Sequence, residues 1–246
     1  KTEGENIRES VIDGAATYLT QLDNNIGKWG GGRYSGTFDY DFDKKTNFSI
    51  QYSARVSGNG GEGDQVTTLL DANRALIFEN VRYIDQTSKS NSNDIDFTFT
   101  KRYENPIQEL IILAQLSLNN RNDYFIAQQN NIAADSSENQ GLDRELNFKV
   151  DYVQPLGDKV KWEFGGKGIL RSATSDGRFY SFNGTNYALN NLRSNFLDYD
   201  QNVAAGYSSF TFELPKKWGI QAGMRYEKTM ISAQFKETAD AEIPNY

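Results

Sequence analysis

The sequence contains no cysteine and no histidine. Without cysteine there is no disulfide framework, no thiol nucleophile and no thiolate ligand for zinc. Without histidine there is no Ser-His-Asp triad and no imidazole for acid–base catalysis. Many common enzyme chemistries are therefore excluded. We expect the protein not to be an enzyme and to hold no cofactor and no metal ion.

Basic residues are outnumbered, with 26 Lys and Arg against 33 Asp and Glu and a net charge of −7. The basic residues are scattered along the chain rather than gathered into a stripe. Binding to nucleic acid needs a positively charged surface that follows the phosphates. We therefore expect no nucleic-acid partner.

Long apolar runs are also lacking. The longest aliphatic run covers residues 110–114, whereas a membrane-spanning helix needs about 20 residues. A mean hydropathy of −0.68 still permits a membrane β-barrel, because its strands alternate lipid-facing and lumen-facing residues and its loops are polar. The first residues begin no apolar signal-peptide core, and the last residues contain no clear closing strand. We expect a piece of a longer mature protein.

Aromatic residues are abundant and follow a period of two. The 14 Tyr and 15 Phe are good strand formers. Alternation of apolar and polar residues predicts a strand with two different faces, and here it occurs in pairs of segments joined by short turns. Four hairpins are predicted, at residues 33–56, 94–118, 146–170 and 201–227, with turns at residues 43–46, 104–106, 155–158 and 215–217.

Several of the eight predicted strands reach the roughly 9–11 residues that a tilted membrane strand needs. Polar segments between the hairpins, at residues 58–93, 119–143 and 172–199, are predicted to be long loops. Short turns at one end and long loops at the other are typical of outer-membrane barrels, whose short turns face the periplasm.

The predicted fold is all-β, with antiparallel transmembrane β-barrel hairpins that form part of a larger barrel over residues 31–236. Residues 1–30 are an uncertain N-terminal segment, in which residues 7–22 are interpreted as a short helix or a loop. Residues 237–246 are interpreted as a truncated tail or the start of a further loop.

Three groups of residues resemble sites of known chemistry. Asp39, Asp41 and Asp43 share one strand face, but no calcium-binding loop surrounds them, and we interpret them as polar lumen-facing residues. The glycine-rich residues 58–63 lack the following lysine and helix of a phosphate-binding loop, so they predict a surface loop. No spacing singles out two carboxylates as a glycosidase pair, and no catalytic residue is predicted.

Aromatic residues also suggest two surfaces. Residues 177–187 suit recognition of sugars or amphipathic ligands, and a loop that packs its own rings over a barrel mouth explains them equally well. Other aromatic residues lie near strand ends and turns. We favour the interpretation that they form an aromatic girdle at the lipid headgroups, and the alternative is that they belong to the core of a soluble protein. The candidate ligand-binding residues of the outer loop are Phe179, Tyr180, Phe182, Asn183 and Tyr187, and the candidate girdle residues are Tyr152, Trp162, Trp218 and Tyr226.

The fourth hairpin resembles a known family. Its segments DQNVAAGY at residues 200–207 and LPKKWGIQAGMRYEKT at residues 214–229 resemble the barrel of TonB-dependent receptors. The outer-membrane β-barrel family common in Bacteroidetes is the most similar. Residues 147–168 are also similar, and the resemblance extends over residues 30–236.

The resemblance implies a Gram-negative outer-membrane location and a barrel of about 22 strands with a plugged lumen. It also implies uptake of a scarce ligand, such as a metal chelate or an oligosaccharide, with energy from the TonB system. The implied partners are outer-membrane lipid, the transported ligand and TonB, which acts through a plug absent from this chain. Arg225 and Glu227 match the family's motif and are implied to be structural, lumen-facing residues.

Two alternatives stay open. The first is a complete eight-stranded outer-membrane barrel that acts as an adhesin or surface-binding module. The second is a soluble β-barrel or sandwich that binds a small ligand.

Overall fold

The computed structural model describes residues 2–12, 15–130 and 132–235. The predicted tail at residues 237–246 lies outside them. The described residues form ten strands and one short 3-10 helix. The strands are β1 (Thr2–Ile12), β2 (Ala15–Asp41), β3 (Thr46–Leu70), β4 (Leu76–Arg102), β5 (Glu109–Gln129), β6 (Ile132–Pro155), β7 (Val160–Phe182), β8 (Tyr187–Leu189), β9 (Asn195–Leu214) and β10 (Trp218–Phe235), and the helix is η1 (Pro215–Lys217).

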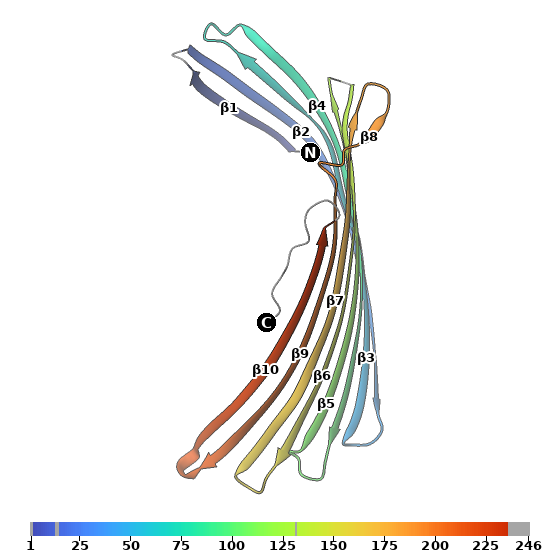
Figure 1. The fold of residues 1–246 in the computed structure, drawn as a ribbon, viewed down its shortest axis with the longest axis vertical. Coiled ribbons are helices and arrows are strands. Elements are labelled where there is room, and N and C mark those ends of the chain that lie inside the picture. The colour runs from blue at the N-terminus through green and yellow to red at the C-terminus, as the bar shows by residue number, and fades with distance from the viewer. Residues whose placement is uncertain (1, 13–14, 131, 236–246) are drawn as a thin grey trace.

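The strands form one antiparallel sheet in which neighbours in the chain are neighbours in space. The order is β1-β2-β3-β4-β5-β6-β7-β9-β10, and the short β8 pairs with the end of β7. Figure 1 shows a single curved layer with β1 at one edge and β10 at the other. The predicted all-β antiparallel fold is confirmed. Among the described residues the strands number ten rather than eight and β1 does not pair with β10, so the alternative of a closed eight-stranded barrel is wrong.

The prediction of three long loops is wrong, because the hairpins continue through these segments. Residues 58–93 hold the end of β3, a turn at residues 71–75 and the start of β4, and the other two segments are likewise mostly strand. Paired backbone N–H and C=O groups satisfy one another along a ladder whatever the side chains are. Polar side chains on both faces remove the alternation, so the pattern predicts loops where the ladder persists.

The N-terminal segment differs from its interpretation for the same reason. Where it is described, it forms β1 and the start of β2, which pair from Thr2 opposite Asn25 onward, rather than a short helix or loop. Polar side chains again occur on both faces of these strands. The alternation that identifies the other hairpins is therefore missing here.

Tight turns close both ends of the sheet. At the end with the predicted turns, Asp43 Oδ1 accepts hydrogen bonds from the N–H groups of Lys45 (2.6 Å) and Thr46 (2.8 Å). Gly157 adopts a φ of 75° in the β6–β7 turn, a conformation that glycine tolerates without strain. At the far end, Asp71 accepts backbone hydrogen bonds within the β3–β4 turn in the way that Asp43 does. Aspartate therefore stabilises turns at both ends.

The described residues form no second layer over the sheet. Within the part of the chain that the structure describes, the buried apolar side chains are only Ala127 and Ala233. No helix among the described residues is long and apolar enough to cross a membrane. The sheet therefore has none of the central core on which a soluble sandwich depends, and its large apolar side chains must meet another environment.

Candidate functional site

An apolar band runs across one face of the sheet. Directly paired residues of an antiparallel sheet share a face, and the register aligns large apolar side chains from strand to strand. The central row of the band contains Phe38, Ile50, Phe97, Ala114 and Phe148. A neighbouring row contains Tyr40, Phe48, Phe99, Ile112 and Val150, and the row on the other side contains Tyr52, Ile95, Leu116 and Leu146. We call this side of the sheet the band face and the opposite side the polar face.

Side chains on the band face are exposed although they are large and apolar. Phe148 is 47% exposed and Met224 is 79% exposed. On the polar face, by contrast, the small side chains of Ser53, Thr229 and Ala233 are buried among their neighbours. An apolar surface of this extent marks a site of contact with lipid or with another apolar surface.

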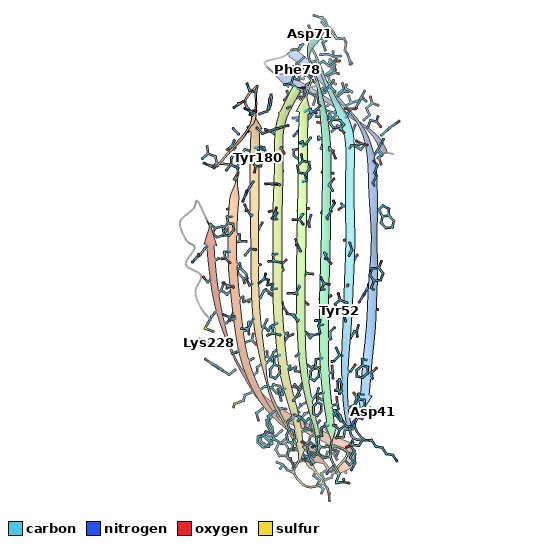
Figure 2. The ribbon with its side chains drawn as sticks, turned by 90° about the vertical axis from the view of Figure 1, so that its right-hand side faces the viewer. Asp41, Tyr52, Asp71, Phe78, Tyr180 and Lys228 are labelled. Atoms are coloured by element: carbon cyan, nitrogen blue, oxygen red, sulfur yellow. The ribbon has the colours of Figure 1, made fainter. Side chains whose placement is uncertain are left out.

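Aromatic rings gather on the band face near the predicted turns. Trp162 stacks on Phe210 with ring centroids 5.7 Å apart, and Trp162 Nε1 donates a hydrogen bond to Ser208 Oγ (2.8 Å). Tyr40 on β2 and Phe42 in the turn that follows make an edge contact at 5.0 Å. Figure 2 shows side chains crowded at this end, where Asp41 is labelled, with Tyr52 higher on the sheet. Amphipathic rings at this level suit the interface between lipid and water.

The candidate girdle residues all lie on the band face. Tyr152, Trp162 and Trp218 lie close to turns, and Tyr226 lies farther along β10. The rings of Tyr40, Phe42 and Phe48 extend the same group onto β2 and β3 and were not among the predicted girdle residues. Their alternation in the sequence was the signal that could have identified them.

The apolar run shifts along the strands across the sheet. It covers residues 34–42, at the end of β2 and the start of the turn after it, and residues 218–226 on β10. Phe38 is the centre of the first run and Ala222 is the centre of the second. When the pairing is followed from strand to strand across the sheet, Phe38 leads to Lys228 rather than to Ala222. A shift of about one residue per strand, with a rise of about 3.3 Å and a spacing of about 4.8 Å, corresponds to a strand tilt of about 30°. Membrane barrels tilt their strands by roughly 35–45°, so the band follows the geometry of a barrel wall.

The shift also accounts for a lysine in the central row. Lys228 follows Tyr226 at the margin of the apolar run on β10, although its register partners on β2 to β6 are apolar. Figure 2 shows Lys228 on the edge strand. A lysine at the margin of an apolar band can place its methylene groups on apolar surface and its ammonium group among headgroups and water.

The polar face beside the apolar band carries a network of paired side chains. Gln115 Nε2 donates a hydrogen bond to Asp96 Oδ1 (2.7 Å), and Asn147 Nδ2 donates to Gln115 Oε1 (3.2 Å). One row away, Arg171 donates to Glu145 Oε2 (2.8 Å from Nε) and, through Nη1, to a glutamine on β9 (2.9 Å). The network spans β4 to β9 and gives Gln115 and Arg171 two side-chain partners each.

A family comparison agrees with these two faces. The family model described as the outer membrane protein beta-barrel family matches residues 101–246, which is more than half of the chain. The chain belongs to the outer membrane protein beta-barrel family. No curated protein matches the chain. Membership places this barrel protein in the Gram-negative outer membrane, with its apolar band against lipid, and the alternative of a soluble barrel is wrong.

Within this outer-membrane barrel, Arg225 and Glu227 lie on the polar face of β10. Arg225 Nη2 and Glu227 Oε2 form a salt bridge at 2.6 Å. The two residues therefore pair with each other, and Lys149 and Asp151 form a similar pair on β6 (2.6 Å). Exposed pairs of this kind stabilise a fold by about 1 kcal/mol at most.

The candidate ligand-binding residues do not lie on one loop. Phe179, Tyr180 and Phe182 belong to β7, Asn183 begins a turn, and Tyr187 belongs to β8. Register places Tyr180, Phe182 and Tyr187 on the side of the band face, and Phe182 and Tyr187 make an edge contact at 5.4 Å. Phe179 points to the polar side, where the Arg193 guanidinium lies 3.3 Å from its ring centroid. The structure therefore brings three of the five together and separates Phe179 from them.

Two of the three aspartates near the β2–β3 turn have structural partners. Asp43 caps the turn, and the N–H of Lys45 is the largest cause that lowers the pKa of this carboxyl from its ordinary value. Asp41 Oδ1 accepts a hydrogen bond from Asn47 (2.8 Å). Among the described residues, no three acidic side chains are grouped as ligands for a metal ion. Residues 58–63 lie within β3, so they are strand rather than the predicted surface loop.

Proposed function

We propose that this chain forms part of the barrel wall of a TonB-dependent receptor that takes up a scarce ligand across the outer membrane. The open sheet is the observation that carries the proposal. Because β1 and β10 do not pair, these ten strands form only part of a barrel wall, and the whole barrel has more than ten strands and a wider lumen. Transporters of about 22 strands have a lumen wide enough for a plug and a solute. Transport, rather than catalysis, is the role that such a wall supports.

The polar face supports an aqueous lumen on its side of the wall. Its amides and carboxylates are joined by hydrogen bonds across β4 to β9, and Arg225 and Glu227 continue the polar surface on β10. In the proposal these residues line the lumen and hold the wall rigid around a plug. Membrane barrels with polar interiors use this arrangement for water-filled or plugged channels.

The ends of the strands support ligand capture outside the membrane. Strands β2 to β7 are 21 to 27 residues long, whereas crossing a bilayer takes about 9–11 residues. The half of the sheet beyond the apolar band therefore projects from the membrane. In the proposal, Tyr180, Phe182, Asn183 and Tyr187 form one capture surface there and Phe179 belongs to the lumen side. The ligand is a metal chelate or an oligosaccharide.

Uptake by cells tests the proposal. Cells that make the full-length protein, in a strain without other transporters for the probes, are incubated with radiolabelled maltohexaose or with a ferric tris-catecholate. The proposal predicts that at least one probe accumulates above the level in cells without the protein, and that a protonophore abolishes the accumulation. Accumulation that persists with the protonophore indicates a passive pore and contradicts the TonB step. No accumulation of either probe contradicts uptake of these two ligand classes.

A further inference from the structure

A shallow hollow lies on the polar face, in the half of the sheet beyond the apolar band. Its lining includes Asn59 on β3, Gln86 and Ser88 on β4, Asp123 on β5 and Asn139 on β6. Register places Asn59, Ser88, Asp123 and Asn139 in one row across the four strands, and Gln86 lies beside this row on the same face. This region, which we call the upper hollow, therefore directs amide, hydroxyl and carboxylate groups into one space.

Three polar side chains of the upper hollow have free hydrogen-bonding capacity. Within the described part of the chain, no hydrogen bond joins the side chain of Asn59, Gln86 or Ser88 to another residue. Nearer the membrane on the same face, Gln115 and Arg171 are by contrast each paired with two side chains. Donors and acceptors that are left free in a hollow are available to a ligand.

An exposed tryptophan stands at one side of the upper hollow. Trp29 on β2 pairs directly with Asn59, so the two side chains share the polar face, and the tryptophan is 88% exposed. The residues that flank Trp29 on this face of β2 are Gly27 and Gly31, so no neighbouring side chain of β2 covers the indole ring. Phe125 on β5 lines the hollow itself. The hollow thus combines free amides with aromatic surface.

The charges in the hollow cancel. Arg121 and Asp123 are the charged residues among those that line it, and Arg121 Nε lies 2.9 Å from both carboxylate oxygens of Asp123. Because the guanidinium is already paired, the lining residues offer no free cation to an anionic chelate. A neutral ligand with many hydroxyl groups matches the free amides, and its C–H faces match the indole ring.

We propose that the upper hollow binds a neutral oligosaccharide, with Trp29 stacked on a sugar ring and Asn59, Gln86 and Ser88 hydrogen-bonded to sugar hydroxyls. The inference rests on the proposed function, because it requires the polar face to line a lumen open to solutes. It narrows the ligand from a scarce solute to a neutral glycan. It also places the binding residues on strand walls, away from Phe182 and Tyr187.

Calorimetric titration of the full-length protein in detergent tests the proposal, with neutral hexasaccharides of glucose, xylose and mannose and with a ferric tris-catecholate as probes. At least one neutral hexasaccharide should bind. Trp29→Ala should raise its Kd by about tenfold or more, and Trp29→Tyr should restore most of the affinity. Asn59→Ala and Gln86→Ala should each raise the Kd about tenfold. The matched control is Asn91→Ala, which removes an amide from the opposite face of β4 and should leave the Kd unchanged.

The outcomes separate this inference from the proposed function. Binding of the chelate together with failure of all neutral sugars overturns the upper hollow as a glycan site and leaves receptor function intact. Sugar binding that Trp29→Ala and Gln86→Ala do not weaken also overturns it. Because Trp29 and Gln86 are exposed, neither change removes buried contacts. Comparing boiled and unboiled samples of each variant on a gel checks its folding, since a folded barrel migrates as a compact band only before boiling.

Discussion

Replacing Ile50 by arginine should destabilise the barrel, whereas the same change at the neighbouring Gln51 should not. Ile50 lies in the central row of the apolar band between Phe38 and Phe97. Its side chain is 39% exposed, so an arginine fits without displacing a packed core. Arginine near the middle of a bilayer costs about 2–4 kcal/mol in barrel stability. The unfolding equilibrium should therefore shift by about 30- to 900-fold.

Gln51 is the matched control because it lies one residue away on the polar face. Its side chain forms no hydrogen bond with another described residue, so Gln51→Arg should change stability by no more than about 0.5 kcal/mol. Urea unfolding of the full-length protein in phospholipid vesicles, followed by tryptophan fluorescence, measures both variants. Equal stability of the two variants would refute a lipid-facing band, since a partly exposed residue in water tolerates arginine.

Three further changes test individual contacts. Because the pKa of Asp43 is lowered in the folded state, its carboxylate stabilises the fold above the ordinary pKa of 3.8, and this effect is lost as the pH falls through the folded-state pKa. The thermal unfolding temperatures of wild type and Asp43→Asn should therefore differ at pH 7 and converge near pH 2. Gly165→Ala places a Cβ 2.3 Å from Val150 O and should cost about 1–3 kcal/mol in urea unfolding, whereas Gly168→Ala, with 4.0 Å of clearance, should be tolerated. Arg171→Ala should cost about 1 kcal/mol or less in the same assay, because the residue is partly exposed; a larger loss would contradict a surface pair.

Sequence alone was sufficient for the part of the fold that meets lipid. The alternation around Phe38 and Ile50 predicts two strands and their facing sides, and the structure pairs these two residues directly. Period-two patterning has a physical cause there, because one face needs apolar side chains and the other does not. Beyond the band both faces carry polar side chains, so residues 58–93 carry no such pattern although they pair on both sides of the turn at residues 71–75.

The candidate site was less accessible from sequence for a related reason. Phe182 and Tyr187 attract notice as neighbours in a short aromatic segment, and they do lie in contact. Trp29, Asn59 and Gln86 belong to three different strands, and only the register brings them to one face. The apolar band fixes the register of the strands, and the backbone hydrogen bonds continue the same register beyond the band. No local sequence pattern in these segments predicts it.

The position of the three tryptophans relative to lipid tests the central claim most directly. Three variants of the full-length protein each retain Trp29, Trp162 or Trp218 and have phenylalanine at the other two positions. Each is reconstituted into vesicles that contain brominated phosphatidylcholine, which quenches indole fluorescence on contact. Strong quenching of Trp162 and Trp218, with Trp29 almost unquenched, is the predicted result, since only the first two lie on the band face. Equal quenching of all three, or quenching of Trp29 alone, would contradict the assignment of the apolar band to lipid and of the polar face to the lumen.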